Sequence, residues 1–353
     1  MIDRLVVACS RAGCESVHLV SREPLENLPR ARALKIPVSC SASLPAKSDA
    51  EVLALEDSWL LQSYDLERLA RLGGRLVASD GSPIPAGVLS ARLLMDRSTD
   101  ASAEILQPAL RLHRVHRTEA LAIPVSNSME AKLASAALWK SIHSSTDGFV
   151  DRWFNRPLGR LFLSKPLIHT PISPNQISLI SISIGVAGAW FLGQVEASRV
   201  VLGALLFQIS AMVDCVDGDV ARVLFKESKM GKWLDLGGDQ VVHLCVFIGI
   251  TVGLLRRHTP GPWAILGAVT VVGAILSFCV VLRGILNPRL IGNYGLQRFV
   301  DAATTRDFSV LVLVLAVWGH LEWFLWMAAM GSHVFWVTAV TLQRRALTGS
   351  DVP

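Results

Sequence analysis

Four aspartates with regular spacing lie in a part of the sequence that is otherwise apolar. They form two clusters, Asp214-Cys-Val-Asp217 and Asp235-Leu-Gly-Gly-Asp239. Carboxylate oxygens are hard ligands of the kind that Mg²⁺ uses together with substrate phosphates. A carboxylate can also take the proton of an attacking hydroxyl group. These residue types therefore point to a metal-assisted transfer of a phosphoryl group.

Small residues share the helix faces of these acids. If the first cluster is helical, one face holds Asp214, Asp217, Gly218 and Ala221. On the following helix, one face holds Gly231, Asp235, Gly238 and Asp239. Only eight residues separate Arg222 from Gly231. The two helices should then be antiparallel neighbours, and the four carboxylates should converge beside side chains too small to block a bulky ligand.

The cost of such acids in a membrane selects among the possible functions. A charged residue at a helix centre costs about 2.5 to 3.5 kcal/mol on insertion scales. Arg222 and Lys232 alone do not neutralise four carboxylates, so we expect a divalent cofactor, Mg²⁺ or Mn²⁺. Helix ends in water would not need Gly and Ala beside each acid pair. An ion- or proton-coupled transporter explains the acids, but not the small residues or Arg222.

Composition indicates that the acids belong to a membrane domain. Of 353 residues, 51% are hydrophobic and only 18% are charged, which is too apolar for a soluble protein of this size. Long charge-free stretches follow Lys165. At about 20 apolar residues per span, we expect six transmembrane helices, near 175–194, 199–224, 233–255, 262–283, 307–319 and 321–342. Ser173-Pro-Asn-Gln176 predicts a capping box at the start of the first.

Basic residues flanking the spans predict the orientation. Most of them lie on the cytoplasmic side if the amino-terminal part is cytoplasmic, and Arg199, Arg256 and Arg257 are the exceptions. We therefore expect an integral protein of the cytoplasmic membrane whose active site faces the cytoplasm. These flanks also account for the net charge of +5, and because no nucleic-acid motif is visible we expect no nucleic-acid partner. The six cysteines form no CxxC pair and predict reduced thiols.

The amino-terminal third has a different character. Strand-like runs near 16–20, 36–40, 59–61 and 75–79 alternate with helical stretches near 1–9 and 65–72, and Asp80-Gly-Ser-Pro83 is a turn signal. This alternation predicts a small α/β domain with parallel strands. We divide the chain into an α/β domain (1–128), a linker with an amphipathic helix (129–172) and the membrane domain (173–345).

The amphipathic helix is expected between 147 and 165. Arg152, Arg156 and Arg160 recur every four residues, while aromatic and aliphatic residues occupy the other faces. This pattern is typical of a helix lying in the membrane interface. A surface helix of the soluble part is the alternative, since its apolar side would also fit a soluble core.

With these residues in place, the chain resembles the CDP-alcohol phosphatidyltransferase family, whose signature is D-x2-D-G-x2-A-R-x8-G-x3-D-x3-D. The resemblance implies a six-span, usually homodimeric enzyme that moves a substituted phosphoryl group from a CDP-linked donor to an alcohol acceptor and releases CMP. By matching position it implies that Asp214, Asp217 and Asp235 bind metal, and that Asp239 binds metal and is also the general base. It further implies a substrate-binding set of Gly218, Ala221, Arg222 and Gly231.

A longer similarity concerns the donor. Segments 146–152, 155–157 and 173–176 resemble those of bifunctional members that join a cytidylyltransferase to a di-inositol-phosphate-phosphate synthase. The resemblance makes CDP-inositol the candidate donor, and a CDP-diacylglycerol-dependent phospholipid synthase is the alternative. The Gly-rich basic loop that a nucleotidyltransferase needs is not visible, so we expect the first domain to be a degenerate nucleotidyltransferase-like domain. Asp65 and Asp80 are candidate remnants of its metal site, although a helix start or a surface turn is the preferred explanation for them.

Weaker candidates remain around the site. His243 lies one helical turn after Asp239 and is placed to orient it, with simple packing as the alternative. Asn175 lies at the mouth of the first span, either near the nucleotide or as a helix-start residue. The cytoplasmic arginines Arg283, Arg289 and Arg298 are candidates for binding an acceptor phosphate, or are only positive flanks of the spans.

Overall fold

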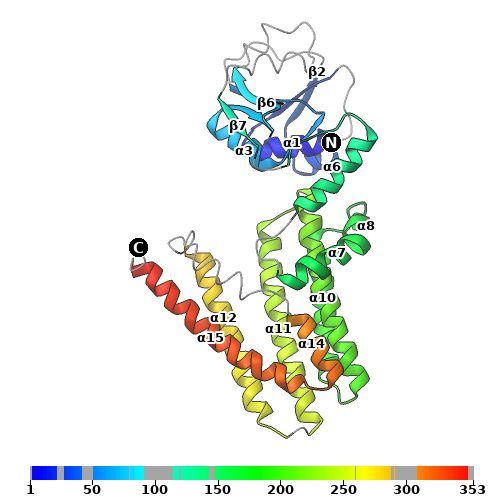
Figure 1. The fold of residues 1–353 in the computed structure, drawn as a ribbon, viewed down its shortest axis with the longest axis vertical. Coiled ribbons are helices and arrows are strands. Elements are labelled where there is room, and N and C mark those ends of the chain that lie inside the picture. Colours follow the sequence, from blue (N-terminus) through cyan, green and yellow to red (C-terminus); the bar gives the residue numbers. More distant parts are fainter. Residues whose placement is uncertain are drawn as a thin grey trace. The chain divides into compact units, whose positions relative to one another are not determined.

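The computed structural model describes residues 2–21, 28–41, 51–78, 80–90, 114–118, 121–142, 148–258, 260–287, 290 and 308–348 (Figure 1). Contacts divide the chain into two compact units, Met1–Ile142 and His143–Pro353. Helix α6 (Ser128–Ser141) has its amino-terminal cap on Asn127 and groups with the first unit. The expected linker therefore contributes its first helix to the amino-terminal unit. The roles assigned to the three predicted parts stay predictions.

The first unit is a mixed α/β structure. Its helices before α6 are α1 (Ile2–Arg11), α2 (Pro29–Ala33) and α3 (Ser63–Leu72). Its strands are β1 (Val17–Val20), β2 (Val38–Ser41), β3 (Glu51–Leu55), β4 (Trp59–Leu60), β5 (Gly74–Val77), β6 (Pro83–Ser90), β7 (Val115–Arg117) and β8 (Ile123–Pro124). Each strand and helix that the sequence pattern predicts in this unit is present, while β3, β6, β7, β8 and α2 are additional.

The strand directions correct one prediction. The largest sheet has the order β3-β6-β5-β7. Among the described strands, β1–β2 and β5–β7 pair in parallel, but β3–β6, β5–β6 and β4–β8 are antiparallel. The turn at Asp80 explains the difference, because so short a connection from β5 to β6 can join only antiparallel strands. Asp80 stabilises that turn, since its Oδ1 accepts hydrogen bonds from the Ser82 backbone N (2.8 Å) and Oγ (2.6 Å).

Asp65 and Asp80 both have structural partners. Asp65 is fully buried on α3 and accepts a hydrogen bond from Thr118 Oγ1. Asp80 lies in its own turn at the surface. Within the residues that the structure describes, neither belongs to a group of side chains able to hold a metal ion. The described geometry thus favours the structural explanation for both.

The second unit is helical throughout its described length. The 151–167 segment is one continuous run of helical turns: η1 (Asp151–Asn155), α7 (Arg156–Gly159), η2 (Arg160–Ser164) and α8 (Lys165–Leu167). The long helices are α9 (Pro174–Leu192), α10 (Ala197–Leu224), α11 (Lys229–Arg256), α12 (Trp263–Leu286) and α15 (Leu321–Thr348), and α14 (Phe308–Trp318) is shorter.

Five helices are long and apolar enough to cross a membrane, namely α9, α10, α11, α12 and α15. The predicted span at 307–319 corresponds to α14, which has 11 residues. At 1.5 Å per residue such a helix is about 16 Å long, whereas a bilayer core is about 30 Å thick. The chain is thus an integral membrane protein with five candidate spans, and the count of six stays a prediction.

Small residues bring three of these helices close together. A Cβ atom at Gly203 of α10 would lie 2.7 Å from the Gly188 carbonyl of α9. A Cβ atom at Gly249 of α11 would collide with the Ala189 carbonyl of α9. In membranes such small residues let helix backbones approach closely. Helix α9 therefore holds α10 and α11, which carry the four aspartates, at short range.

Polar caps fix the ends of these helices. The predicted capping box is confirmed: Ser173 Oγ accepts from the Gln176 backbone N, and Gln176 Oε1 accepts from the Ser173 backbone N (2.8 Å). At the other end, Arg256 donates to the Gly193 carbonyl and Arg257 to the Gly253 carbonyl. Both carbonyls belong to helix ends, where cations are favourable. Arg256 and Arg257, which are exceptions to the expected excess of basic residues on the cytoplasmic side, thus have a structural role.

The cysteines of the first unit provide a test of its core. Cys9 is buried on α1, and burial together with the nearby Cys14 raises the pKa of Cys9 to about 12, whereas Cys40 on β2 is exposed. At pH 8 only about one Cys9 thiol in ten thousand would be ionised, and the thiolate is the reactive form. We expect a maleimide to label Cys40 quickly and Cys9 only after denaturation, as measured by mass spectrometry of digested protein. Equal labelling rates would contradict this packing of α1.

Candidate active site

Three of the four aspartates come together in the structure. Asp214 and Asp217 lie on α10 and Asp235 on α11, and one carboxylate oxygen of each lies within 4.8 Å of the others. Asp214 and Asp217 are each only 7% exposed. Three hard oxygen ligands at this separation fit a divalent cation such as Mg²⁺ or Mn²⁺. Among the described residues this is the one group with that capacity.

Asp217 also has a partner that the sequence did not reveal. Ser178 of α9 is buried and its Oγ donates a hydrogen bond to Asp217. A metal-ligating carboxylate is typically oriented by such a hydrogen bond. One turn further along α9, Ser181 donates to the Ser210 carbonyl of α10, and Ser210 Oγ donates to the Ser181 carbonyl. The serines at three-residue spacing on α9, Ser178 and Ser181, were a sequence signal for these contacts that was missed.

Asp239 lies on α11 outside the group of three. With Asp214 it lines a small cavity of about 20 Å³, which is room for about one water molecule. Other polar residues around this cavity are Ser181, Ser210, His243 and Ser309. The structure therefore separates the predicted general base from the predicted metal ligands, and a role for Asp239 as a ligand stays a prediction. His243 faces the same cavity and packs edge-on against the Phe308 ring, with centroids 4.9 Å apart.

The small residues of the signature fall into two kinds. Around Gly218 the nearest group to an added Cβ atom would be the Arg222 guanidinium, at 3.5 Å, so space remains above this glycine. At Gly231 an added Cβ atom would lie 3.1 Å from Asn175 Oδ1, which places Asn175 beside the start of α11. Gly238, by contrast, is filled by Ile182 of α9 and serves packing. Gly218 is therefore the stronger candidate for contact with a bulky ligand.

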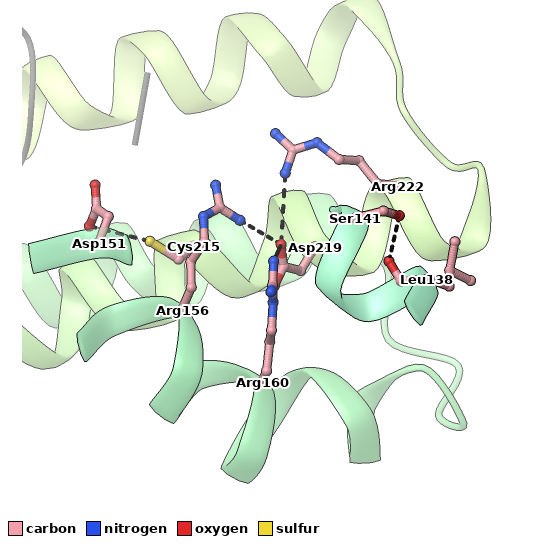
Figure 2. A network of polar contacts seen from close by, with 8 residues as sticks. All are labelled: Leu138, Ser141, Asp151, Arg156, Arg160, Cys215, Asp219 and Arg222. Atoms are coloured by element: carbon pink, nitrogen blue, oxygen red, sulfur yellow. Dashed lines mark hydrogen bonds and ion pairs between the residues drawn. The ribbon is translucent and has the colours of Figure 1, made fainter. Parts of the chain in front are cut away.

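A buried ion cluster lies on another face of α10 (Figure 2). Asp219, with a side chain only 1% exposed, accepts from Arg156 Nη1 at 2.5 Å and from Arg160 Nε at 2.6 Å. Arg222 Nη1 lies 3.7 Å from the same carboxylate. Sequence analysis missed Asp219 because the signature leaves its position open. Its charge in an apolar helix was nevertheless a signal for a buried pair.

The 151–167 segment presents its polar side to the protein and its apolar side outward. Its buried residues include Asp151, Asn155, Arg156 and Ser164. Six large apolar side chains are between 44% and 67% exposed, namely Phe149 just before it and Trp153, Phe154, Leu158, Leu161 and Phe162 within it, while Leu163 and Leu167 are partly buried. A soluble surface helix has the opposite arrangement. The prediction of a helix lying in the membrane interface therefore fits this geometry better than its alternative does.

A polar chain continues this contact along α10. Asn155 Nδ2 donates to Asp151 Oδ1 at 2.7 Å, and Gln208 Nε2 of α10 donates to Asn155 Oδ1 at 2.7 Å. The α10 residues that make polar contacts with the segment include Gln208, Cys215 and Asp219. Their spacing of seven and four residues places them on one face of the helix. Helix α10 thus carries separate faces for the candidate metal ligands and for the 151–167 segment.

The predicted role of three cytoplasmic arginines in binding an acceptor phosphate stays a prediction. Arg283 is exposed near the end of α12, whereas Arg289 and Arg298 lie outside the described residues. Nothing in the described geometry brings Arg283 to the three aspartates.

Comparison with known proteins gives a family for the membrane domain. Residues 171–342 match the sequence model of the CDP-alcohol phosphatidyltransferase family. The chain is 26% identical over 260 residues to the bifunctional IPC transferase and DIPP synthase of Archaeoglobus fulgidus, covering 73% of this chain and 50% of that protein. It is 31% identical over 172 residues to the protein of the same name from Rubrobacter xylanophilus, covering 49% and 37%. The chain thus spans half or less of the length of these relatives.

A solved structure also matches the membrane domain. It is the Mycobacterium tuberculosis phosphatidylinositol phosphate synthase with CDP-DAG bound, which is 18% identical with a TM-score of 0.38 over 53% of this chain and 92% of that chain.

The hydrogen bond from Ser178 gives a test of the metal site. Ser178→Ala removes the donor that orients Asp217, so we expect binding of Mn²⁺ to the purified protein to weaken on the order of tenfold. Free Mn²⁺ can be measured by electron paramagnetic resonance. Ser183→Ala is the matched control, because Ser183 is exposed on the same helix and donates only to the Leu179 carbonyl. Equal Mn²⁺ affinity in the two variants would rule out this role of Ser178.

Proposed function

Since residues 171–342 form a CDP-alcohol phosphatidyltransferase domain, we propose that the chain is a membrane enzyme that transfers a substituted phosphoryl group from a CDP-linked donor to an alcohol and releases CMP. The observation that carries this proposal is the group of Asp214, Asp217 and Asp235 within 4.8 Å of one another. The space above Gly218, bounded by the Arg222 guanidinium at 3.5 Å from an added Cβ atom, lies on the same helix as two of these acids. An ion pathway would have no need of that space or of Arg222.

The proposed reaction assigns each residue a step. Asp214, Asp217 and Asp235 would hold divalent metal, which when bound neutralises charge on the donor's two phosphates. Gly218, Ala221 and Gly231 leave room for the cytidine end of the donor, and Arg222 donates hydrogen bonds to a phosphate oxygen.

The chemical step then balances around Asp239. As the acceptor oxygen bonds to the phosphorus that carries the donor alcohol, Asp239 takes the hydroxyl proton. The bond from that phosphorus to the bridging oxygen of the anhydride breaks, and CMP leaves with this oxygen. Asp239 and Asp214 line the same small cavity, which supports this assignment.

CDP-inositol is the donor that we propose. The names of the two bifunctional relatives support it, and the similarity to the first of them covers 73% of this chain, more than the membrane domain alone. A CDP-diacylglycerol-dependent phospholipid synthase is the alternative. The degenerate nucleotidyltransferase-like character of the first unit, a homodimer and a cytoplasmic active site are further parts of this proposal.

A donor assay tests this assignment. Purified protein in detergent with Mg²⁺ or Mn²⁺ is mixed with labelled CDP-inositol or CDP-diacylglycerol and candidate alcohols, and CMP is measured. We expect CMP from CDP-inositol. CMP from CDP-diacylglycerol alone would instead support the phospholipid synthase. No CMP from either donor, together with ion flux in liposomes, would favour a transporter.

Replacement of the base gives a second test. Asp239→Asn keeps the size of the side chain but cannot take the acceptor proton, so we expect the rate of CMP release to fall roughly 10²- to 10⁴-fold. The variant should remain folded, as judged by size-exclusion chromatography. Asp57→Asn is the control, because Asp57 is an exposed acid of the first unit and should leave the rate unchanged. Full activity of Asp239→Asn would remove the assignment of the base.

A further inference from the structure

Asp219 has no step in the proposed reaction, yet it pairs with several cations. Its carboxylate is buried and meets three guanidinium groups, those of Arg156, Arg160 and Arg222 (Figure 2). Arg160 contacts both oxygens, through Nε at 2.6 Å and Nη2 at 3.3 Å. One carboxylate thus faces three positive charges, and the two arginines of the 151–167 segment make its hydrogen bonds.

Arg222 is held differently from the other two arginines. Its Nη1 lies 3.7 Å from Asp219 Oδ1, which is an ion pair but too long for a hydrogen bond. The same Nη1 is buried and has no hydrogen-bond partner among the described residues. It is also the nearest atom to the space above Gly218, at 3.5 Å from an added Cβ atom. An N–H group of Arg222 is therefore left without a hydrogen bond beside the space proposed for the CDP-linked substrate.

The metal-binding acids compete for the same guanidinium. Arg222 interacts electrostatically with the carboxylates of Asp217 and Asp235. Arginine and carboxylate readily form short, two-pronged pairs. Without an opposing charge, Arg222 would move toward these two acids and occupy oxygens that a cation needs. Asp219 supplies the opposing charge from three residues before Arg222 on α10.

We propose that Asp219 is a positioning residue that holds Arg222 away from Asp217 and Asp235. These two acids then remain available to divalent metal, and Arg222 Nη1 remains available to a phosphate of the donor. Arg156 and Arg160 make the short hydrogen bonds to Asp219, and Arg222 makes the long contact. The metal half of this inference needs only the described carboxylates, and the phosphate half rests on the proposed function.

A purely structural role makes a different prediction. Asp219 also anchors the 151–167 segment, so its loss would loosen that segment even if Arg222 were unaffected. Arg160→Gln separates the two roles, since it weakens the anchor but leaves Asp219 beside Arg222. Asp219→Glu keeps the charge and serves as the conservative variant.

The test is binding of Mn²⁺ to the full chain in detergent, measured by electron paramagnetic resonance without any donor. We expect Asp219→Asn to weaken binding by about tenfold, and Arg160→Gln and Asp219→Glu to stay within about twofold of the unaltered chain. In the double variant Asp219→Asn/Arg222→Gln the competitor is gone, so affinity should return to that of Arg222→Gln. Equal effects of Asp219→Asn and Arg160→Gln would overturn the proposal, as would weak binding that persists in the double variant.

Two additions keep the test decisive. Asp219→Asn leaves guanidinium groups buried and is at risk of misfolding, so the same comparison is repeated in an Arg156→Gln background, which removes one of those charges. The KM for CDP-inositol is measured alongside, and we expect Asp219→Asn to raise KM more than it lowers kcat. The Mn²⁺ pattern decides the positioning role even if no CDP-linked donor yields CMP, an outcome that would sink only the proposed function.

Discussion

Buried carboxylates in an apolar helical unit impose the constraint on which the rest of this structure depends. Each such acid needs a cation or a hydrogen-bond donor, because an uncompensated charge away from water is strongly unfavourable. Two solutions stand side by side on α10. Asp219 is compensated within the chain, by Arg156 and Arg160. Asp214 and Asp217 meet another acid, Asp235, and so present a site that a divalent cation would complete.

The two solutions require different neighbours. For the candidate metal ligands, α9 and α11 must lie close to α10, and glycines at the helix contacts allow this approach. For Asp219, a separate element must bring arginines to a buried position, and the 151–167 segment does so by turning its polar side inward. Its aromatic side then faces outward, which is favourable only where lipid replaces water. The predicted placement of this segment in the membrane interface would thus also favour the inward turn of its arginines.

The sequence predicted those parts that depend on local spacing. Asp214, Asp217 and Asp235 follow from helix periodicity and a short connection, and the capping box at Ser173 follows from the pattern of its four residues. Local spacing could not predict contacts between residues that are far apart in the sequence. Ser178 reaches Asp217 across 39 positions and Arg156 reaches Asp219 across 63, and neither distance has a periodic signal. Strand direction in the first unit failed for a related reason, since alternating strands and helices indicate parallel pairing only when helices make the connections.

The separation of Asp239 from the three-carboxylate group bears on the chemistry of the site. Asp239 instead shares a small cavity with Asp214, His243 and three serines. Such a lining can hydrogen-bond a water molecule and keeps the acid close to a metal ligand without joining the group. The roles of Asp239 as general base and as a further metal ligand both stay predictions, and its place beside Asp214 is compatible with either.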